Sequence, residues 1–352
     1  MSIASSSPSF SIRQARDLVD DLFVHRPVIY WTDFLLSLTV GYAFAGIYLR
    51  STPFSARQIV CFTVAGFALF RVASYIHEIT HMCGRQLLGF RVAWNVLFGI
   101  PALMPSFFYE NHIDHHNSSH YGTIRDGEYL PMGAGPLYRI LLFWAQVPFL
   151  PIYIVLRFLL SPITFLSPAL RNWTLEHASS FVINFRHRLM VPKSAPRRVW
   201  ATVELACCLR AWAMLGVVAL GYFPWTRLVS LYCLATFILG LNYVRNLTAH
   251  HYRNTGAAMS HLDQLSDSVT ITGHWFWTEL FFPLALRYHA LHHMFPSIPY
   301  HELARAHRRL IAKLPEDSPY HQTVYPGYWS VVRQLLRDAR RSNEKQNTVA
   351  SA

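Results

Sequence analysis

The chain has 352 residues, of which 52% are hydrophobic and only 14% are charged, and its formal net charge is +12. Soluble proteins carry roughly 25% charged residues, so this composition excludes an ordinary soluble globular protein. The sequence contains no recognised motif for binding nucleic acid, so we expect no nucleic-acid partner. Attraction to the anionic headgroups of a bilayer explains the basic balance instead.

Four apolar stretches are long enough to cross a bilayer, which requires about 20 apolar residues in a helix. They are residues 28–49, 58–76, 204–223 and 226–244. We therefore predict an all-α integral membrane protein with four transmembrane helices. Residues 28–76 are expected to form the first pair of helices, and residues 204–246 the second pair.

The placement of positive charge predicts the side of the membrane on which each remaining segment lies. Arg50 and Arg57 are the only basic residues between the first two crossings, and Arg227 is the only one between the second two. Because cytoplasmic loops carry an excess of Lys and Arg, the more basic segments are expected on the cytoplasmic side. They are the N-terminal segment 1–27, the cytosolic or interfacial region 77–203 and the cytosolic region 247–339. The polar tail at 340–352 is expected to be disordered.

Two further apolar stretches are interpreted as interfacial or re-entrant helices. Prolines at positions 101 and 105 interrupt residues 92–108, and prolines at positions 148 and 151 interrupt residues 137–166. A complete crossing by either stretch would place the histidine motifs of the chain on opposite sides of the membrane.

Histidines gather in four motifs beside the predicted crossings. HEITH contains His77 and His81, HIDHH contains His112, His115 and His116, NLTAH contains Asn246 and His250, and HALHH contains His289, His292 and His293. Residues three and four positions apart lie on one face of a helix, so each motif presents its imidazoles together. Candidates for supporting the ligands are His251, His274 and His301. Surface or core roles suit the remaining isolated histidines, His25, His177, His187, His261, His307 and His321.

The HEITH motif also matches the zincin pattern, in which two histidines hold zinc and the glutamate, here Glu78, acts as a general base. A catalytic zinc site uses about three protein ligands, whereas this chain offers many more clustered imidazoles. The chain offers enough nitrogen ligands for two metal ions. This favours iron or another transition metal that binds imidazole. A zinc protease is therefore a less favoured alternative. A metal transporter or metal sensor is also a less favoured alternative. Such a protein would place its ligands inside the crossings, whereas these motifs lie at and beyond the ends of the crossings.

These motifs resemble the three histidine boxes of the integral-membrane fatty acid desaturase family, and NLTAH resembles the family's additional Asn-x-x-x-His element. The resemblance extends over roughly residues 60–310. It implies a four-helix transmembrane stalk beneath a helical cytosolic cap that holds a di-iron centre. The implied metal ligands are His77, His81, His112, His115, His116, His250, His289, His292 and His293, with Asn246 holding one metal through water.

Two details place the chain within that family. HEITH has three residues between its histidines where many acyl-CoA desaturases have four, which is more similar to sphingolipid desaturases and some bacterial acyl-lipid enzymes. The third box starts with His289 rather than the glutamine of front-end desaturases, and the HPGG signature of a fused cytochrome b5 is absent from the sequence. The resemblance therefore implies an external electron donor of the ferredoxin or cytochrome b5 type.

The expected reaction is desaturation of a lipid acyl chain, with two iron ions as cofactor and O2 as co-substrate. No side-chain acid or base ionises an alkane C–H bond, so the metals must activate oxygen while the protein supplies placement and a dry cavity. No catalytic residue is expected beyond the metal ligands. Hydroxylation of the lipid by the same kind of centre is the alternative. We expect a multi-pass membrane protein with its active site on the cytoplasmic side.

Overall fold

The computed structural model of the chain describes residues 10–350, with side chains described up to Glu344. Helices make up nearly all of its regular structure. In this part of the chain one sheet is present, in which β1 (Thr270–Ile271) and β2 (Val324–Tyr325) pair in parallel. The predicted all-α class is confirmed.

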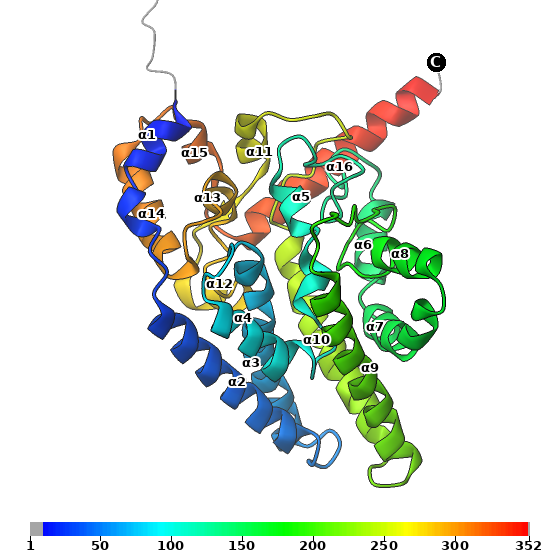
Figure 1. Ribbon diagram of the computed structural model, residues 1–352. Helices are drawn as coiled ribbons and strands as arrows, with labels where there is room; N and C mark the ends of the chain where they lie inside the picture. The colour runs from blue at the N-terminus through cyan, green and yellow to red at the C-terminus, as the bar shows by residue number, and fades with distance from the viewer. Residues whose placement is uncertain (1–9, 351–352) are drawn as a thin grey trace, which may run out of the picture.

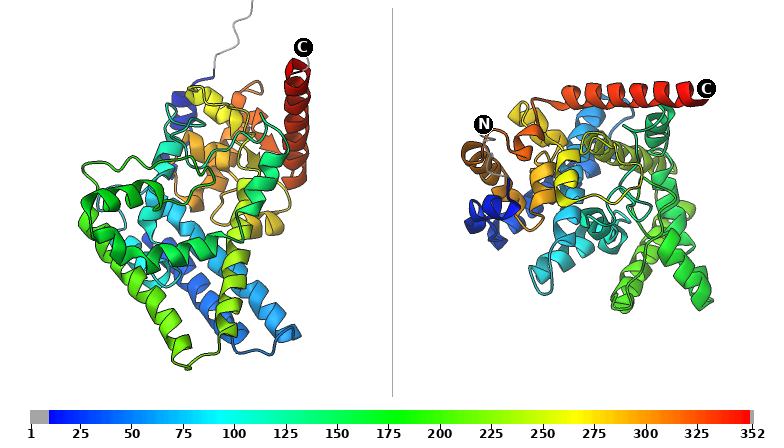
Figure 2. Two further views of the ribbon diagram at one scale, coloured as in Figure 1. Left: turned by 90° about the vertical axis from the view of Figure 1, so that its right-hand side faces the viewer. Right: turned by 90° about the horizontal axis from the view of Figure 1, so that it is seen from above.

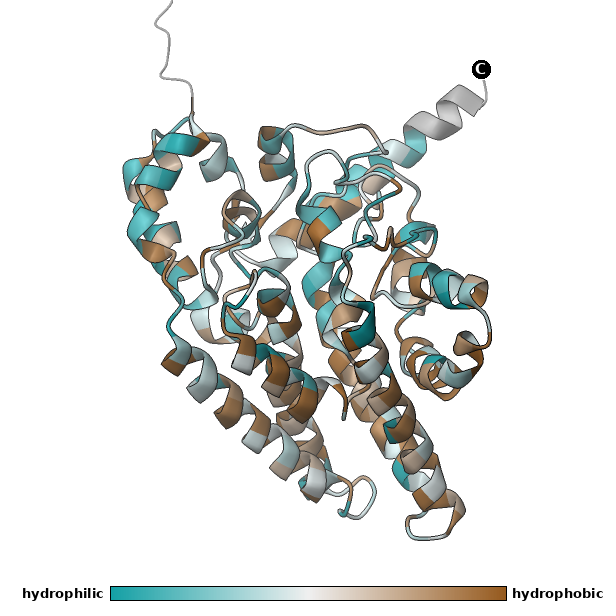
Figure 3. Ribbon diagram, viewed as in Figure 1, coloured by the Kyte–Doolittle hydropathy of each residue, from teal (hydrophilic) through white to brown (hydrophobic). Residues whose placement is uncertain are grey.

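Four long helices form the membrane-spanning part of the molecule. They are α2 (Pro27–Tyr48), α3 (Ala56–Thr80), α9 (Arg197–Ala219) and α10 (Thr226–Asn246). Each is long and apolar enough to cross a membrane, as predicted. Figure 1 shows them as two antiparallel hairpins, α2–α3 and α9–α10, that project from the same side of a helical cap. Figure 2 shows the same arrangement from two further sides, and the hairpins are largely hydrophobic in Figure 3.

The third spanning helix ends earlier than its hydropathy predicts. The apolar pattern extended to residue 223, but α9 ends at Ala219. Gly221 adopts a left-handed backbone with φ +79°, its N–H donates to the Val218 carbonyl, and the Tyr222 N–H donates to the Val217 carbonyl. This is the Schellman arrangement, which satisfies the last carbonyls of a helix and stops it. The helix also starts seven residues before the predicted crossing at 204.

Both proline-interrupted stretches are broken helices. The first consists of α4 (Leu88–Trp94), a π-helical turn η2 (Asn95–Gly99) and the 3-10 turn η3 (Ser106–Tyr109). The second consists of α6 (Tyr138–Ala145), α7 (Leu150–Leu159) and the 3-10 turn η4 (Ser161–Phe165), followed by α8 (Pro168–His177). Helices α6 and α7 bend by 48° at their break and resemble a span only when they are joined. The interfacial or re-entrant placement of both stretches stays a prediction.

Mostly short helices build the cap. They are α1 (Ile12–Asp17), η1 (Asp20–Leu22), α5 (His112–His116), α11 (His261–Asp267), α12 (Trp275–Phe281), α13 (His289–Met294), α14 (Tyr300–Lys313) and α15 (Pro319–Gln322), together with the long C-terminal helix α16 (Tyr328–Ala350). The N-terminal segment joins this layer, because Ala15, Val19 and Leu22 are buried in one cluster with Leu303 and Leu310 of α14. The cap lies over the ends of the hairpins where α3 and α10 finish (Figure 1).

The predicted disordered tail at 340–352 differs from the structure, because α16 continues to Ala350. Residues 351–352 lie outside the described part of the chain. Buried residues at a spacing of four, Val331, Leu335 and Ala339, hold the first half of this helix against the cap. Arg and Glu are good helix formers, so a helix anchored in this way extends through a polar sequence.

A buried ion cluster fixes the broken helices against the second hairpin. Glu204 of α9 is fully buried and forms ion pairs with Arg157 of α7 at 2.8 Å and with Arg171 of α8 at 2.6 Å. Arg157 also donates to the hydroxyls of Ser161 and Ser179. The partners of the carboxylate thus come from the second proline-interrupted stretch, through Arg157, and from α8 directly after it, through Arg171.

Replacing Glu204 with Ala should lower the free energy of unfolding by about 3–5 kcal/mol, because it leaves the buried guanidinium of Arg157 and the partly buried one of Arg171 without a counter-charge. Denaturation of the purified protein in detergent micelles measures this effect. Glu316→Ala, at an exposed position between α14 and α15, is the matched control and should leave stability unchanged. Equal stability of the two variants would show that the cluster has no structural role.

Candidate metal centre

Each histidine motif lies at the end of a helix or on a short helix of the cap. His77 is in the last turn of α3, and His81 directly follows the helix. HIDHH forms α5 and HALHH begins α13. His250 lies four residues beyond the end of α10 and forms an isolated β-bridge with Ser268. These four segments meet where the cap covers the hairpins.

All nine predicted histidines are brought together in two clusters. The first cluster contains His77, His81, His112, His116 and His292, and the second contains His115, His250, His289 and His293. Within each cluster the ring nitrogens that face one another lie within 4.8 Å. Each set of nitrogens is therefore spaced closely enough to hold one metal ion.

The two short helices contribute to both clusters. On α5, His112 and His116 belong to the first cluster while His115 belongs to the second. On α13 the pattern is reversed, since His292 belongs to the first cluster while His289 and His293 belong to the second. In each helix the pair four residues apart faces one site and the remaining histidine faces the other, which places the two sites side by side.

The chemistry of the imidazoles fits metal ions. Nδ1 of His112 donates to Glu128 at 2.8 Å and Nδ1 of His115 donates to Asp126 at 2.9 Å, since a carboxylate only accepts. Their Nε2 atoms therefore carry lone pairs, and Nε2 of His115 lies 3.1 Å from Nε2 of His250. Nε2 atoms of His250 and His289 approach to 2.9 Å, and Nδ1 of His289 has no hydrogen-bond partner in the described part of the chain. Two lone pairs at such separations repel unless a proton or a metal cation lies between them.

Partnerless nitrogens point to the same conclusion in the first cluster. Both ring nitrogens of His77 and Nε2 of His81 are buried without a hydrogen-bond partner in the described part of the chain. Buried polar atoms are rarely left unsatisfied, because each one costs about 1–3 kcal/mol. A metal ion bound in the first cluster would satisfy one nitrogen of His77 and Nε2 of His81.

Burial keeps most of these imidazoles neutral, which is the form that binds metal. Burial lowers the pKa of His116, His292 and His293 well below its usual value, and neighbouring imidazoles lower each pKa further. Burial opposes ionisation of Glu128, but its charge interaction and hydrogen bond with His112 hold the pKa of that carboxyl at about 2. A permanent negative charge therefore lies directly behind a ligand.

The structure supplies supporting residues that sequence reasoning missed. Nδ1 of His250 donates to the Tyr121 hydroxyl at 2.7 Å, and that hydroxyl donates to Asp267 at 2.8 Å. Gln264 lies 3.1 Å from Nδ1 of His293. Such partners orient imidazoles and raise their basicity. The available signal was the pair Asp126 and Glu128 in the loop after HIDHH, in a chain with few carboxylates.

The other predicted positions lie around the clusters or away from them. Asn246, the last residue of α10, lines a small cavity together with His115, His250 and His289, but its role through water stays a prediction. None of the three supporting candidates belongs to a cluster in residues 10–344. His251 lies 3.3 Å from the Tyr325 hydroxyl, and His274 is exposed. The third candidate, His301, lies beside Glu302.

Glu78 does not take the position of a zincin base. Its carboxylate accepts a hydrogen bond from the Tyr30 hydroxyl at 2.6 Å and another from the Tyr300 backbone at 3.3 Å. It belongs to neither cluster. The zincin match of HEITH therefore has no support from the geometry.

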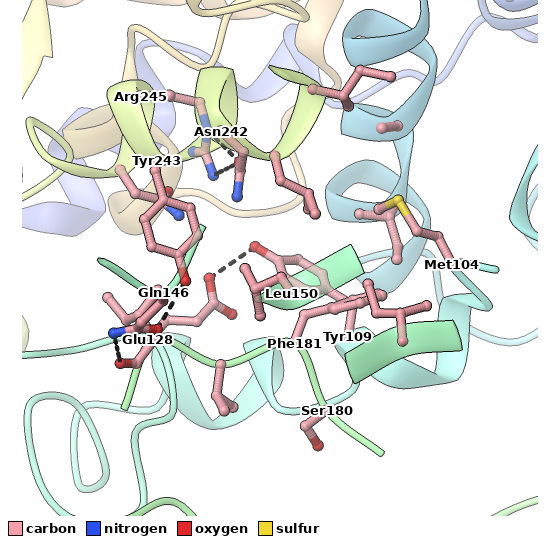
Figure 4. A pocket seen from close by; sticks show the side chains of 18 of the residues that line it. Met104, Tyr109, Glu128, Gln146, Leu150, Ser180, Phe181, Asn242, Tyr243 and Arg245 are labelled. Atoms are coloured by element: carbon pink, nitrogen blue, oxygen red, sulfur yellow. Dashed lines mark hydrogen bonds between the residues drawn. The ribbon is translucent and has the colours of Figure 1, made fainter. Parts of the chain in front are cut away.

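A cavity of about 340 Å³ leads from His77 between α3, α7, α10 and the segment that follows α8. Its walls include the apolar side chains Leu150, Ile154 and Phe181, while Asn242 and Arg245 form part of a polar end (Figure 4). This volume is typical of a site for a small ligand or part of a lipid. The apolar walls of the cavity thus lead up to His77, a member of the first cluster.

Comparisons with known proteins agree with this geometry. The family model described as "Fatty acid desaturase" matches residues 53–324 of the chain. The chain is also 37% identical over 341 residues to a ceramide hydroxylase of Caulobacter vibrioides (strain NA1000 / CB15N), and the alignment covers 94% of each protein.

Replacing a clustered histidine should remove metal, whereas replacing an isolated one should not. We expect two metal ions per purified wild-type chain and one or fewer in His292→Ala and in His115→Ala, because each variant lacks a nitrogen of one cluster. Elemental analysis measures the content. His177→Ala and His321→Ala are the controls. Equal metal content in all four variants, or a single zinc in the wild type, would contradict the assignment of the clusters.

Proposed function

The chain belongs to the fatty acid desaturase family, and on that premise we propose that it is a lipid hydroxylase acting on a ceramide-class lipid. The observation that carries the proposal is the extent of the similarity to a named ceramide hydroxylase, which covers nearly the whole of both chains. Two histidine clusters beside an apolar cavity are consistent with such chemistry. We assign iron to both clusters, with O2 as co-substrate.

Bound iron would supply the activation of O2 that no side chain provides. The atoms balance when a C–H bond becomes C–OH and the second oxygen atom leaves as water, which consumes two electrons and two protons. The protein residues do the remaining work. The nine histidines hold the metals, and Glu128, Asp126 and Tyr121 fix the orientation of three imidazoles. The cavity holds the acyl chain in place and limits access of water, which determines the carbon that is oxidised.

Desaturation is the second candidate function, and the three-residue spacing of HEITH together with the family match favours it. It differs in outcome, since two neighbouring C–H bonds are lost, a double bond forms and two waters leave. The same two electrons and two protons are consumed. The metals, the cavity and the substrate class would serve either reaction.

The electrons require an outside donor, for which we retain a ferredoxin or a cytochrome b5. The sequence HELARAHRRL, residues 301–310 within α14, carries Arg305, Arg308 and Arg309 and indicates a basic docking surface for an acidic donor, but the structure reduces its free charge. Arg309 forms an ion pair with Asp21 and donates to the Leu18 carbonyl. Arg305 lies within 3.9 Å of Asp21 and 3.8 Å of Glu302. The N-terminal segment therefore neutralises much of the surface that the sequence pattern indicated.

The proposal places the cap on the cytoplasmic side. In a cysteine-free background, Ser119→Cys and Glu316→Cys should react with a membrane-impermeant maleimide only after cells are opened. Tyr222→Cys, in the turn between α9 and α10, should react in intact cells. Labelling at positions 119 and 316 from opposite sides would contradict one shared metal centre, and reversed labelling of all three would invert the orientation.

The reaction is tested by lipid mass spectrometry of cells that express the wild type or His292→Ala. We expect ceramide-class lipids that gain one oxygen atom with the wild type and unchanged lipids with the variant. Loss of two hydrogens without added oxygen would select desaturation. Identical lipids in both strains, with an electron donor present, would contradict both candidates.

A further inference from the structure

Arg245 is a buried cation between the large cavity and the histidine clusters. It lies in the last turn of α10 and is 5% exposed. Its side chain lines the 340 Å³ cavity and also the small cavity beside His112, His115 and His250. The residue thus faces the place where a substrate would meet the metals.

The partners of this guanidinium are neutral. Its Nε and Nη2 atoms donate to the Asn242 side-chain oxygen at 3.2 and 3.0 Å, and it interacts with the Tyr109 hydroxyl. Within residues 10–344, no carboxylate lies within 4.0 Å of it. Glu128 lines the same two cavities, but its oxygens already accept from the Tyr109 hydroxyl and from Nδ1 of His112, each at 2.8 Å.

A buried charge without a counter-ion costs several kcal/mol. The cost is greater here because the neighbouring clusters are suited to metal cations. Guanidinium has five N–H donors, and Asn242 takes two of them. The remaining donors require an oxygen acceptor that the chain does not supply as an anion.

Two other polar groups of the cavity are already satisfied. The Tyr243 hydroxyl donates to the side-chain oxygen of Gln146 at 2.9 Å, and the Gln146 amide donates to the Ile183 carbonyl at 3.2 Å. The Ser180 hydroxyl and the His187 ring lack a partner among the described residues, but Arg245 is the guanidinium cation that lines the cavity. In Figure 4 it lies with Asn242 at one end of the site, away from Ser180.

We propose that Arg245 binds a carbonyl oxygen of the lipid substrate and is the specificity-determining residue for the position of oxidation. The acceptor is the amide carbonyl of a ceramide-class lipid or the carboxylate of a fatty acid. A carbonyl held at Arg245 places the adjacent carbons beside the histidine clusters, and the rest of the chain extends along Leu150, Ile154 and Phe181. Oxidation then occurs near the polar end of the lipid rather than in mid-chain. This inference rests on the proposed function for its substrate class.

The test uses purified full-length protein in lipid nanodiscs and three radiolabelled probes of equal chain length, a ceramide, a fatty acid and an alkane. Because a hydrogen bond to a charged group contributes about 1.5–3 kcal/mol, Arg245→Gln should weaken binding of the carbonyl probe by about tenfold or more. Binding of the alkane should be unchanged, and Arg245→Lys should retain part of the affinity. Arg227→Gln, at the other end of α10, is the matched control. The probe that loses affinity, ceramide or fatty acid, identifies the source of the carbonyl.

Metal analysis and product analysis complete the experiment. Tandem mass spectrometry should place the modification next to the carbonyl in the wild-type product. Unchanged binding of both carbonyl probes in Arg245→Gln, or modification in mid-chain, would overturn the inference. If Arg245→Gln loses metal, Arg245→Lys with normal metal content is compared with the wild type instead. Unchanged binding of both carbonyl probes in that variant, or modification in mid-chain, would then overturn the inference. A wild type that binds the carbonyl probes but oxidises no lipid would refute the proposed function and leave the role of Arg245 supported.

Discussion

The structure depends on the repulsion between imidazole lone pairs that face one another without a proton between them. Carboxylates behind His112 and His115 hold the Nδ1 protons and turn the Nε2 lone pairs inward, where other imidazoles approach to about 3 Å. Burial lowers the pKa of His112 and of His250, whereas at His115 the charge of Asp126 outweighs burial and raises the pKa. A cation between the nitrogens relieves the contact. The end of α3, helices α5 and α13 and the segment after α10 meet at this place.

Charge balance around this centre is achieved outside the ligand set. Most of the clustered histidines are neutral, and negative charge comes from Glu128, Asp126 and Asp267, which hydrogen-bond to the outer sides of the clusters directly or through Tyr121. Arg245 adds a positive charge on the cavity side, where the Glu128 carboxylate also lines the wall. The large cavity is therefore lined by charges of both signs close to the histidines.

Local patterns in the sequence predicted most of the features that depend on interactions between residues close together in the chain. Hydropathy located the four crossings, and spacing within the motifs identified all nine histidines that the structure gathers. The end of α9 was misplaced because Gly221 overrides hydropathy through its backbone conformation, and the helical course of residues 340–350 was missed because Leu335 and Ala339 are held by contacts far along the chain. Other long-range contacts are likewise invisible to the periodicity of the sequence. They include the carboxylates that hydrogen-bond to the histidines, the ion pair between Asp21 and Arg309, and the position of Arg245 between the two cavities.

The division of α5 and α13 between the two clusters has a thermodynamic consequence. Each helix is rigid, so a metal ion that fixes His112, His116 and His292 also fixes the orientation of His115, His289 and His293. The ordering entropy for the second site is largely spent when the first is filled, which makes the binding of the two ions positively cooperative. Protein that holds a single ion is then a minor species during maturation.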